Sequence, residues 1–282
     1  MKSIGEKIRI FQVDTFTNKR FHGNPAAVCI LEKPIKDELM QSIALEMNLS
    51  ETAFLLLSDK NIAGNSNVFS LRWFTPKFEV SLCGHATLAT AAVLFDEYNI
   101  KHKRIIFKTK SGELVTKKDK NMIILDFPSD EYIVEDIKFR ENILNAIGIS
   151  KFNNIILGKS TKKLVIHLES YEDVLKLNPN FEIMKKLKLN KIKGLGVTAK
   201  MDGKYDIISR YFNPWAGVNE DPVTGSVHTL LARYWSNILN KKELKAYQAS
   251  KRSGEMILKL RENSRVEILG KFVFSLKGEI FF

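Results

Sequence analysis

Three polar residues stand where they could do acid–base chemistry. Glu51 precedes the apolar run 52–57, where a partly buried carboxylate could take a proton from a substrate carbon and return it elsewhere. His85, one residue into an apolar segment, could bind substrate or donate a proton. Asp221 could bind a substrate amino or hydroxyl group or act as a second acid–base group. The structural alternatives are a surface glutamate paired with lysine, a capping or core histidine, and a turn or helix-capping aspartate.

Two glycines mark places where an anion could bind. Gly84 and Gly225 each begin a segment with the composition of a buried helix. Glycine lets backbone N–H groups approach a ligand closely, and a helix amino end carries about half a positive charge. Two such ends facing one cleft would bind a carboxylate; alternatively, both glycines only permit tight turns. Ser226 would hold a substrate oxygen or cap its helix. The remaining candidates for substrate contact are Asn24, Cys83 and Thr224.

The sequence gives little support for a metal or a nucleotide. Cys83, His85 and His228 fit no standard ligand spacing, and a further acidic or cysteine ligand is missing. The sequence contains no Gly-x-Gly-x-x-Gly or Walker motif. We therefore expect no metal and no nucleotide cofactor, and we expect Cys29 to be a small buried hydrophobe.

Composition excludes several other classes of protein. The chain has 282 residues and a net charge of +12, but its lysines are dispersed and have no aromatic–arginine interleaving. We expect a solvated basic surface and no nucleic-acid partner. No apolar run approaches the roughly 18 residues of a membrane helix, and the first ten residues lack a signal-peptide core. The expectation is a cytoplasmic protein without membrane contact.

The pattern of hydrophobic residues predicts mixed α and β structure. Strands are expected at 8–16, 26–31, 52–57, 68–74, 105–108, 113–117, 122–127, 154–157, 163–168, 194–199, 205–212, 255–260, 265–269 and 272–282, with a turn at 23–25 and a polar loop at 61–67. Helices are expected at 37–47, 84–98, 141–147, 171–176, 181–187 and 225–238. The first three turns of 84–98 have no charged face, so strands must surround this helix.

An internal repeat divides the chain into halves. Arg72-Trp73-Phe74-Thr75-Pro76 precedes Cys83-Gly84-His85, and Arg210-Tyr211-Phe212-Asn213-Pro214 precedes Thr224-Gly225-Ser226. Each copy continues into an apolar helix. A duplicated strand–turn–helix unit predicts two similar lobes with a cleft between them. We expect an amino-terminal lobe at 1–128, joined by the last strand 272–282, and a carboxy-terminal lobe at 129–271.

These motifs resemble the phenazine biosynthesis-like (PhzF-like) family. The resemblance rests on Gly23-Asn24-Pro25-Ala26-Ala27, Leu49-Ser50-Glu51-Thr52-Ala53, the two repeat segments, Glu220-Asp221-Pro222-Val223-Thr224-Gly225-Ser226, and Gln248-Ala249-Ser250. It implies the diaminopimelate-epimerase fold, an α+β architecture of two pseudo-symmetric lobes. In each lobe a curved, mostly antiparallel sheet surrounds one central helix. It also implies a homodimer without a cofactor.

The resemblance assigns the acid–base role to Glu51, with His85, Asp221 and Ser226 as partner groups. It implies an isomerase that moves a proton on a small cyclic or amino-acid-like carboxylate. Epimerase and racemase relatives use two cysteines, and here Thr224 stands opposite Cys83 and cannot act as a thiolate. An amino-acid epimerase with Glu51 and Asp221 as opposed bases, or a non-enzymatic ligand-binding protein, are the alternatives.

Overall fold

The computed structural model describes residues 6–58, 61, 66–135, 141–188 and 191–282. The chain divides into two compact units. The first unit comprises Met1–Asp126 and Leu269–Phe282, and the second comprises Phe127–Ile268. Part of the polar loop expected at 61–67, residues 62–65, lies outside the described residues.

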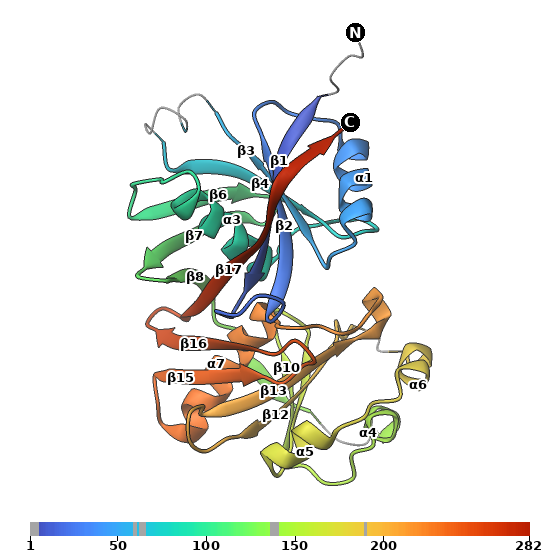
Figure 1. The fold of residues 1–282 in the computed structure, drawn as a ribbon. Helices are drawn as coiled ribbons and strands as arrows, with labels where there is room; N and C mark the ends of the chain where they lie inside the picture. The colour runs from blue at the N-terminus through green and yellow to red at the C-terminus, as the bar shows by residue number, and fades with distance from the viewer. Residues whose placement is uncertain (1–5, 59–60, 62–65, 136–140, 189–190) are drawn as a thin grey trace. The chain divides into compact units, whose positions relative to one another are not determined.

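The first unit is a mixed sheet. Its strands are β1 (Lys7–Thr15), β2 (Asn24–Leu31), β3 (Thr52–Leu56), β4 (Val68–Phe74), β5 (Glu79–Val80), β6 (Arg104–Thr109), β7 (Gly112–Asp119), most of β8 (Met122–Pro128) and the end of β17 (Arg265–Phe281). β1 is antiparallel to β2 and β17, whereas β2 is parallel to β3. β4 is antiparallel to β3 and β5 and parallel to β6, and β7 is antiparallel to β6 and β8. Figure 1 shows the red β17 running beside β1, and Lys7 at the start of β1 pairs with Phe281 at the end of β17.

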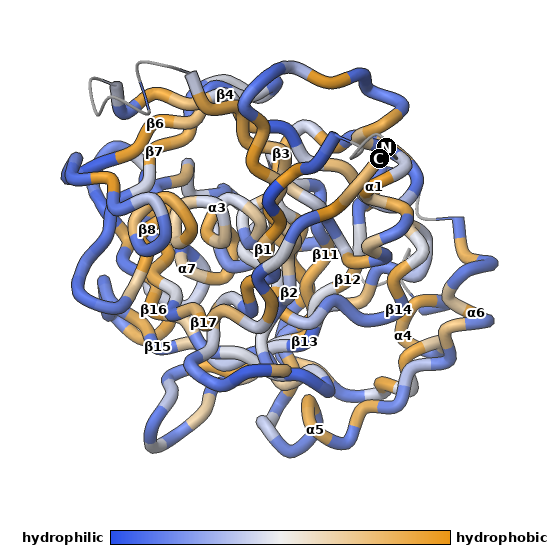
Figure 2. Tube along the Cα trace, turned by 45° about the horizontal axis from the view of Figure 1, so that its top comes forward, coloured by the Kyte–Doolittle hydropathy of each residue, from blue (hydrophilic) through white to orange (hydrophobic). Residues whose placement is uncertain are grey.

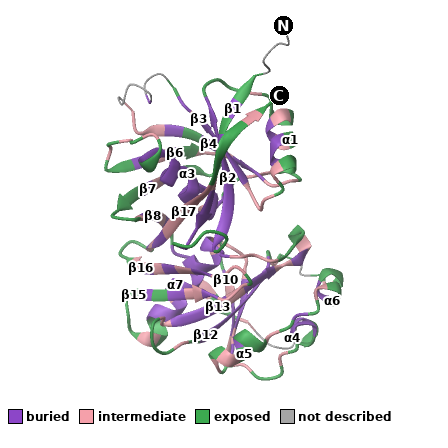
Figure 3. Cartoon of the chain, viewed as in Figure 1, coloured by how far each residue is buried: buried purple, intermediate pink, exposed green. Residues whose placement is uncertain are grey.

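Helix α3 (Gly84–Asp96) forms the centre of this unit. Every residue from His85 to Phe95 is buried, and Figures 2 and 3 show a helix that is apolar and covered along its length. It contacts β1, β2, β3 and β7. A helix without a polar face is stable only when it is surrounded, so the sequence of α3 requires these strands.

Helix α1 (Asp37–Met47) covers the other face of the same sheet. Its buried Met40, Ile43 and Ala44 pack in one cluster with Phe54 of β3 and Phe74 of β4. Side chains alternate between the two faces of a strand. Residues 52, 54 and 56 therefore face α1, and residues 51, 53 and 55 face α3.

The second unit repeats this order of strand pairings. Its elements are β9 (Tyr132–Val134), α4 (Glu141–Ile147), β10 (Asn154–Gly158), β11 (Leu164–His167), α5 (Tyr171–Lys176), α6 (Phe181–Lys186), β12 (Leu195–Lys200), β13 (Ile207–Asn213), a 3-10 turn (Pro214–Ala216), β14 (Val218–Glu220), α7 (Gly225–Leu239), β15 (Glu243–Gln248), β16 (Gly254–Arg261) and the start of β17. β10 is antiparallel to β9 and β11, and β11 is parallel to β12. β13 is antiparallel to β12 and β14 and parallel to β15, which is antiparallel to β16.

Helix α7 takes the place in the second unit that α3 takes in the first. Most of its residues are buried, and it contacts β15 and β16. Trp235 of α7 donates its indole N–H to the Thr198 hydroxyl of β12 at 3.0 Å. Helices α4, α5 and α6 pack with the opposite face of the strands in a separate apolar cluster.

Matching contacts confirm the internal repeat. The Arg72 guanidinium binds both carboxylate oxygens of Glu79, at 2.7 and 2.8 Å. Arg210 does the same with Glu220, at 2.7 and 3.0 Å. Each guanidinium also lies 5.1 Å from the centre of the phenylalanine ring two residues later. Both copies therefore preserve three-dimensional contacts as well as sequence.

The predicted α+β class is confirmed, and the differences from the prediction are local. β17 is one strand where two were expected, and Asn24 and Pro25 belong to β2, where a turn was expected. The short strands β5, β9 and β14 and the longer β15 were not predicted. Among the described residues, no helix has the length and hydropathy needed to cross a bilayer.

Candidate active site

Glu51 lies beside His85 in the first unit. It immediately precedes β3, where Thr52 pairs with Phe74, and the strand alternation directs it toward α3. Its carboxylate Oε2 lies 3.3 Å from Nε2 of His85, and its side chain is 20% exposed. Neighbouring apolar strand residues and the helix thus hold this carboxylate near a buried imidazole, and part of it remains open to a ligand.

His85 is buried and neutral. Burial lowers the pKa of its imidazole to about 4, because a charged ring would lose its hydration. Nδ1 lies 3.5 Å from Sγ of Cys83, a contact that a thiol can make. Nε2 has no well-aligned hydrogen bond, so its approach to Glu51 is close but not optimally directed. A buried polar atom in this condition is costly to the fold, and such atoms concentrate where ligands bind.

The remaining predicted residues of this unit are Cys83 and Gly84 at the start of α3 and Asn24 at the start of β2. Cys83 precedes Gly84, and the Cys83 carbonyl accepts the backbone N–H and the hydroxyl of Thr87. The side chain of Cys83 does not cap the helix. Asn24 is fully buried at the start of β2, where its carbonyl accepts the Thr15 hydroxyl at 2.9 Å. The structure therefore brings Glu51, Cys83 and His85 together and puts Asn24 at the start of the strand next to β3.

These three residues raise the question of a metal ion. Their ligand atoms lie within 4.8 Å of one another, and carboxylate, thiolate and imidazole are a plausible zinc set. However, Nδ1 of the His85 ring faces Cys83, whereas Nε2 faces Glu51. One ion cannot use both nitrogens, so the ring would have to turn away from one partner. We still expect no metal here, and elemental analysis of the purified protein tests this expectation.

The predicted residues of the second unit form a cluster of their own. The Thr224 hydroxyl donates to Oδ2 of Asp221 at 2.5 Å. The Thr224 backbone N–H donates to Oε1 of Gln248 at 2.8 Å, and the Gln248 amide donates to the Asp221 carbonyl at 2.8 Å. Asp221, Thr224 and Gln248 are thus locked together immediately before Gly225. Ser226 is the second residue of α7 and not its N-cap residue, so the capping alternative is wrong.

Gln248 and His228 were not predicted as site residues. Gln248 is fully buried, and its only sequence signal was its place in the family motif 248–250. His228 is also fully buried: Nδ1 donates to the Thr224 carbonyl at 2.7 Å, and Nε2 therefore accepts from Ser209, at 3.3 Å. Burial lowers the pKa of His228 to about 4, so this ring supports the start of α7 as a neutral group.

The repeat shows which residue of the second unit corresponds to Glu51. Thr52 pairs with Phe74, and Leu195 pairs with Phe212. Glu51 therefore corresponds to Gly194. A side chain at Gly194 would place its first carbon 2.0 Å from the Tyr211 hydroxyl oxygen, and φ there is +120°. Only glycine fits this position, so the second unit has no counterpart of the Glu51 carboxylate.

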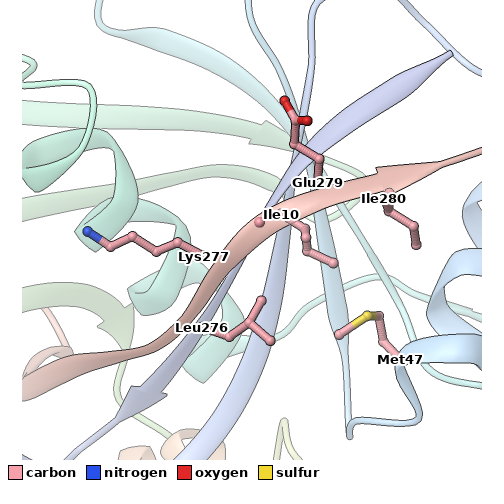
Figure 4. A pocket seen from close by; sticks show the side chains of 7 residues that line it. Ile10, Met47, Leu276, Lys277, Glu279 and Ile280 are labelled. Carbon is pink, nitrogen blue, oxygen red and sulfur yellow. The ribbon is translucent and has the colours of Figure 1, made fainter. Parts of the chain in front are cut away.

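A surface hollow of about 290 Å³ in the first unit lies away from these residues. Ile10, Met47 and residues 276–280 of β17 line it (Figure 4). Ile10, Met47 and Ile280 belong to the apolar cluster beneath α1. This hollow is thus on the face of the sheet that Glu51 does not face, and it includes none of the predicted site residues.

Comparison with known proteins identifies the family. The sequence model of the family described as phenazine biosynthesis-like protein matches residues 13–278. The chain belongs to this family. A mouse phenazine biosynthesis-like domain-containing protein 1 is 44% identical over 97% of this chain and 99% of its own length. A Halalkalibacterium halodurans protein named an uncharacterised isomerase is also 44% identical, over 96% of this chain and 97% of its own length.

A solved structure extends the match to the fold. The crystal structure of a PhzF-family protein from Enterococcus faecalis is 39% identical, has a TM-score of 0.87, and covers 98% of this chain and 100% of its own. The resemblance found in the motifs is confirmed over nearly the whole chain, including 130–200, where no motif was recognised.

Proposed function

We propose that this protein is an isomerase that moves a proton on a small carboxylate substrate without a cofactor, with Glu51 as its acid–base group. One observation carries the proposal: a partly exposed carboxylate beside a buried, neutral histidine at the amino end of a central helix. The isomerase name of a relative 44% identical over nearly the whole chain supports the class of reaction.

The proposed reaction uses Glu51 twice. Its carboxylate takes a proton from a substrate carbon, and the electron pair of the broken C–H bond moves into the adjacent π system. The resulting carboxylic acid then gives a proton to a different carbon, which restores the carboxylate. Product and substrate have the same composition, and no oxidant or reductant takes part. His85 lies close enough to orient the carboxylate between the two steps.

The two units differ in a way that favours one base over two. A racemase with opposed bases needs a proton acceptor on each side of the reacting carbon. Where the first unit has Glu51 and Cys83, the second has Gly194 and Thr224, and neither can accept a proton at neutral pH. Asp221 is the remaining carboxylate of the second cluster, and its Oδ2 already accepts the Thr224 hydroxyl. In this proposal Asp221 binds the substrate and does not abstract its proton.

The proposed substrate is a carboxylate because of the two central helices. Each begins with glycine, Gly84 or Gly225, and neither N-cap side chain bonds to the first turn. The first N–H groups of such helices are good donors to an anion, and the helix dipole adds favourable charge. Asn24 at the start of β2 and Ser226 in the first turn of α7 are proposed to bind other polar groups of the substrate.

Deuterium incorporation tests the reaction class. The protein is incubated in deuterated water with a panel of small cyclic carboxylates and amino acids, and the products are analysed by mass spectrometry and NMR. Deuterium at a carbon together with a shifted double bond is the expected result. Deuterium with inversion at one centre and no shift would instead indicate an epimerase. A panel compound that binds tightly but never exchanges would indicate a ligand-binding protein.

A further inference from the structure

Cys83 and His85 form a contact that the proposed proton transfer does not itself use. Cys83 is 6% exposed, and its Sγ lies 3.5 Å from Nδ1 of His85. Its carbonyl is bonded twice to Thr87, so the backbone that carries this thiol is fixed. The start of α3 therefore holds the two side chains in contact.

A neutral imidazole has one N–H and one lone pair, so each nitrogen of His85 has a different role. With the proton on Nδ1, the Nε2 lone pair would face the Glu51 carboxylate oxygen at 3.3 Å, and two electron-rich atoms would repel each other. With the proton on Nε2, an N–H faces the carboxylate and the Nδ1 lone pair faces sulfur. In the second arrangement Cys83 must be a neutral thiol whose S–H donates a hydrogen bond to Nδ1.

We propose that Cys83 is a positioning residue that donates its S–H to Nδ1 of His85 and so holds the histidine proton on Nε2, facing Glu51. The role rests on the proposed function of Glu51, because its purpose is to give an ionised Glu51 a donor partner. Cys83 then acts through His85. It is neither a nucleophile nor a second base, although a cysteine beside a histidine at a helix start has the position of one.

The corresponding residue of the second unit supports a donor role. Thr224 immediately precedes Gly225, as Cys83 precedes Gly84, and its hydroxyl donates to Asp221. With this role, each unit has a hydrogen-bond donor directly before its central helix, Cys83 for His85 and Thr224 for Asp221. A thiol and a hydroxyl share this capacity, whereas only the thiol could be a strong nucleophile.

The tautomer of His85 can be measured without a substrate. The protein has five histidines, and ¹⁵N-labelled imidazoles report through long-range ¹H–¹⁵N NMR spectra which ring nitrogen carries the proton. The His85→Asn variant identifies the His85 signals by their loss. We expect the wild type to show the Nε2–H tautomer at neutral pH. A proton on Nδ1, or a charged ring at pH 7, would overturn the proposal.

Two substitutions separate donation from packing. Cys83→Ser keeps a donor and should keep the Nε2–H tautomer, whereas Cys83→Ala removes it and should give a mixture or the Nδ1–H form. An Nε2–H population in Cys83→Ala equal to that of the wild type would refute the role. Thermal unfolding verifies that both variants fold. If Cys83→Ala does not fold, the tautomer observed in the wild type decides whether the proposal stands. Because no turnover is involved, an error in the proposed function leaves this readout intact.

Discussion

Lowering the pH from 7 to 5 should destabilise both units, because each contains a buried neutral histidine. His85 lies in the first unit and His228 in the second, and burial lowers the pKa of each from 6.5 to about 4. The unfolded chain binds a proton on each ring as the pH falls through 6.5. The folded chain does not bind it until about pH 4, so stability is lost across this window as the pH falls.

The size of the effect follows from the two pKa values. At pH 5 an unfolded histidine is almost fully protonated and a folded one is almost fully neutral. This difference lowers the free energy of unfolding by about 2 kcal/mol per histidine relative to pH 7. These two histidines should therefore account for a loss of about 4 kcal/mol if the units unfold together and about 2 kcal/mol for each unit if they unfold separately. Burial also lowers the pKa of His167 in the second unit to about 4, and this partly exposed ring adds a smaller loss to that unit.

Urea unfolding followed by circular dichroism at pH 7, 6 and 5 measures this loss. The matched controls are His85→Gln, which keeps a nitrogen near the position of Nε2, and His228→Asn, which keeps an N–H for the Thr224 carbonyl. Each should remove about 2 kcal/mol of the stability loss between pH 7 and 5. A wild-type stability that is constant from pH 7 to 5, or a dependence unchanged in the double variant, would refute the reasoning.

Substitutions of Gly194 and Thr224, each with a matched control variant, test the second unit. Gly194→Ala should cost about 3 kcal/mol or more in urea unfolding, because φ is +120° and Tyr211 occupies the side-chain position. Gly203→Ala, with φ +101° and open space, should cost only about 1 kcal/mol; equal losses would contradict the packing argument. Thr224→Val, which removes the donor to Asp221, should lower kcat/KM about 10- to 100-fold on a substrate found by the deuterium screen. Thr224→Ser should restore it to within about threefold, and no loss in Thr224→Val would exclude a role for this contact.

The two helix predictions of the first unit agree closely with the structure. The segment at 84–98 has no charged face in its first three turns, and the structure buries α3 on all sides. Helix α1 was predicted with its observed bounds, Asp37–Met47, because its apolar residues recur with helical spacing. In both cases the pattern of one segment was sufficient, since burial of that segment determines its composition.

Predictions failed where distant contacts decide the structure. The sequence predicted two strands separated near Gly270, whereas the structure has the single strand β17. Glycine occupies position 270 inside this strand because Phe16 and Leu88 leave no room for a side chain. β15 was missed because its buried positions are Leu244, Ala246 and Gln248, of which only Leu244 is strongly apolar. Neither reason can be seen in the residues next to each position.

The candidate site was predicted as residue types but not as contacts. Glu51 and His85 were both identified, but their approach depends on the register of β3 and the start of α3. Gly194 gave no signal, because its importance lies in corresponding to Glu51 across the repeat and in its contact with Tyr211. The asymmetry between the units became visible only through the strand pairings.

Deuterium exchange by two variants tests the claim that Glu51 alone moves the proton. On any compound that the wild type labels in deuterated water, Glu51→Gln should slow incorporation at least about 1,000-fold, because the amide cannot accept the proton. Asp221→Asn should weaken substrate binding but still label the saturated substrate at a rate within about tenfold of the wild type. Incorporation by Glu51→Gln at a rate near that of the wild type, or complete loss in Asp221→Asn at saturation, would contradict the account.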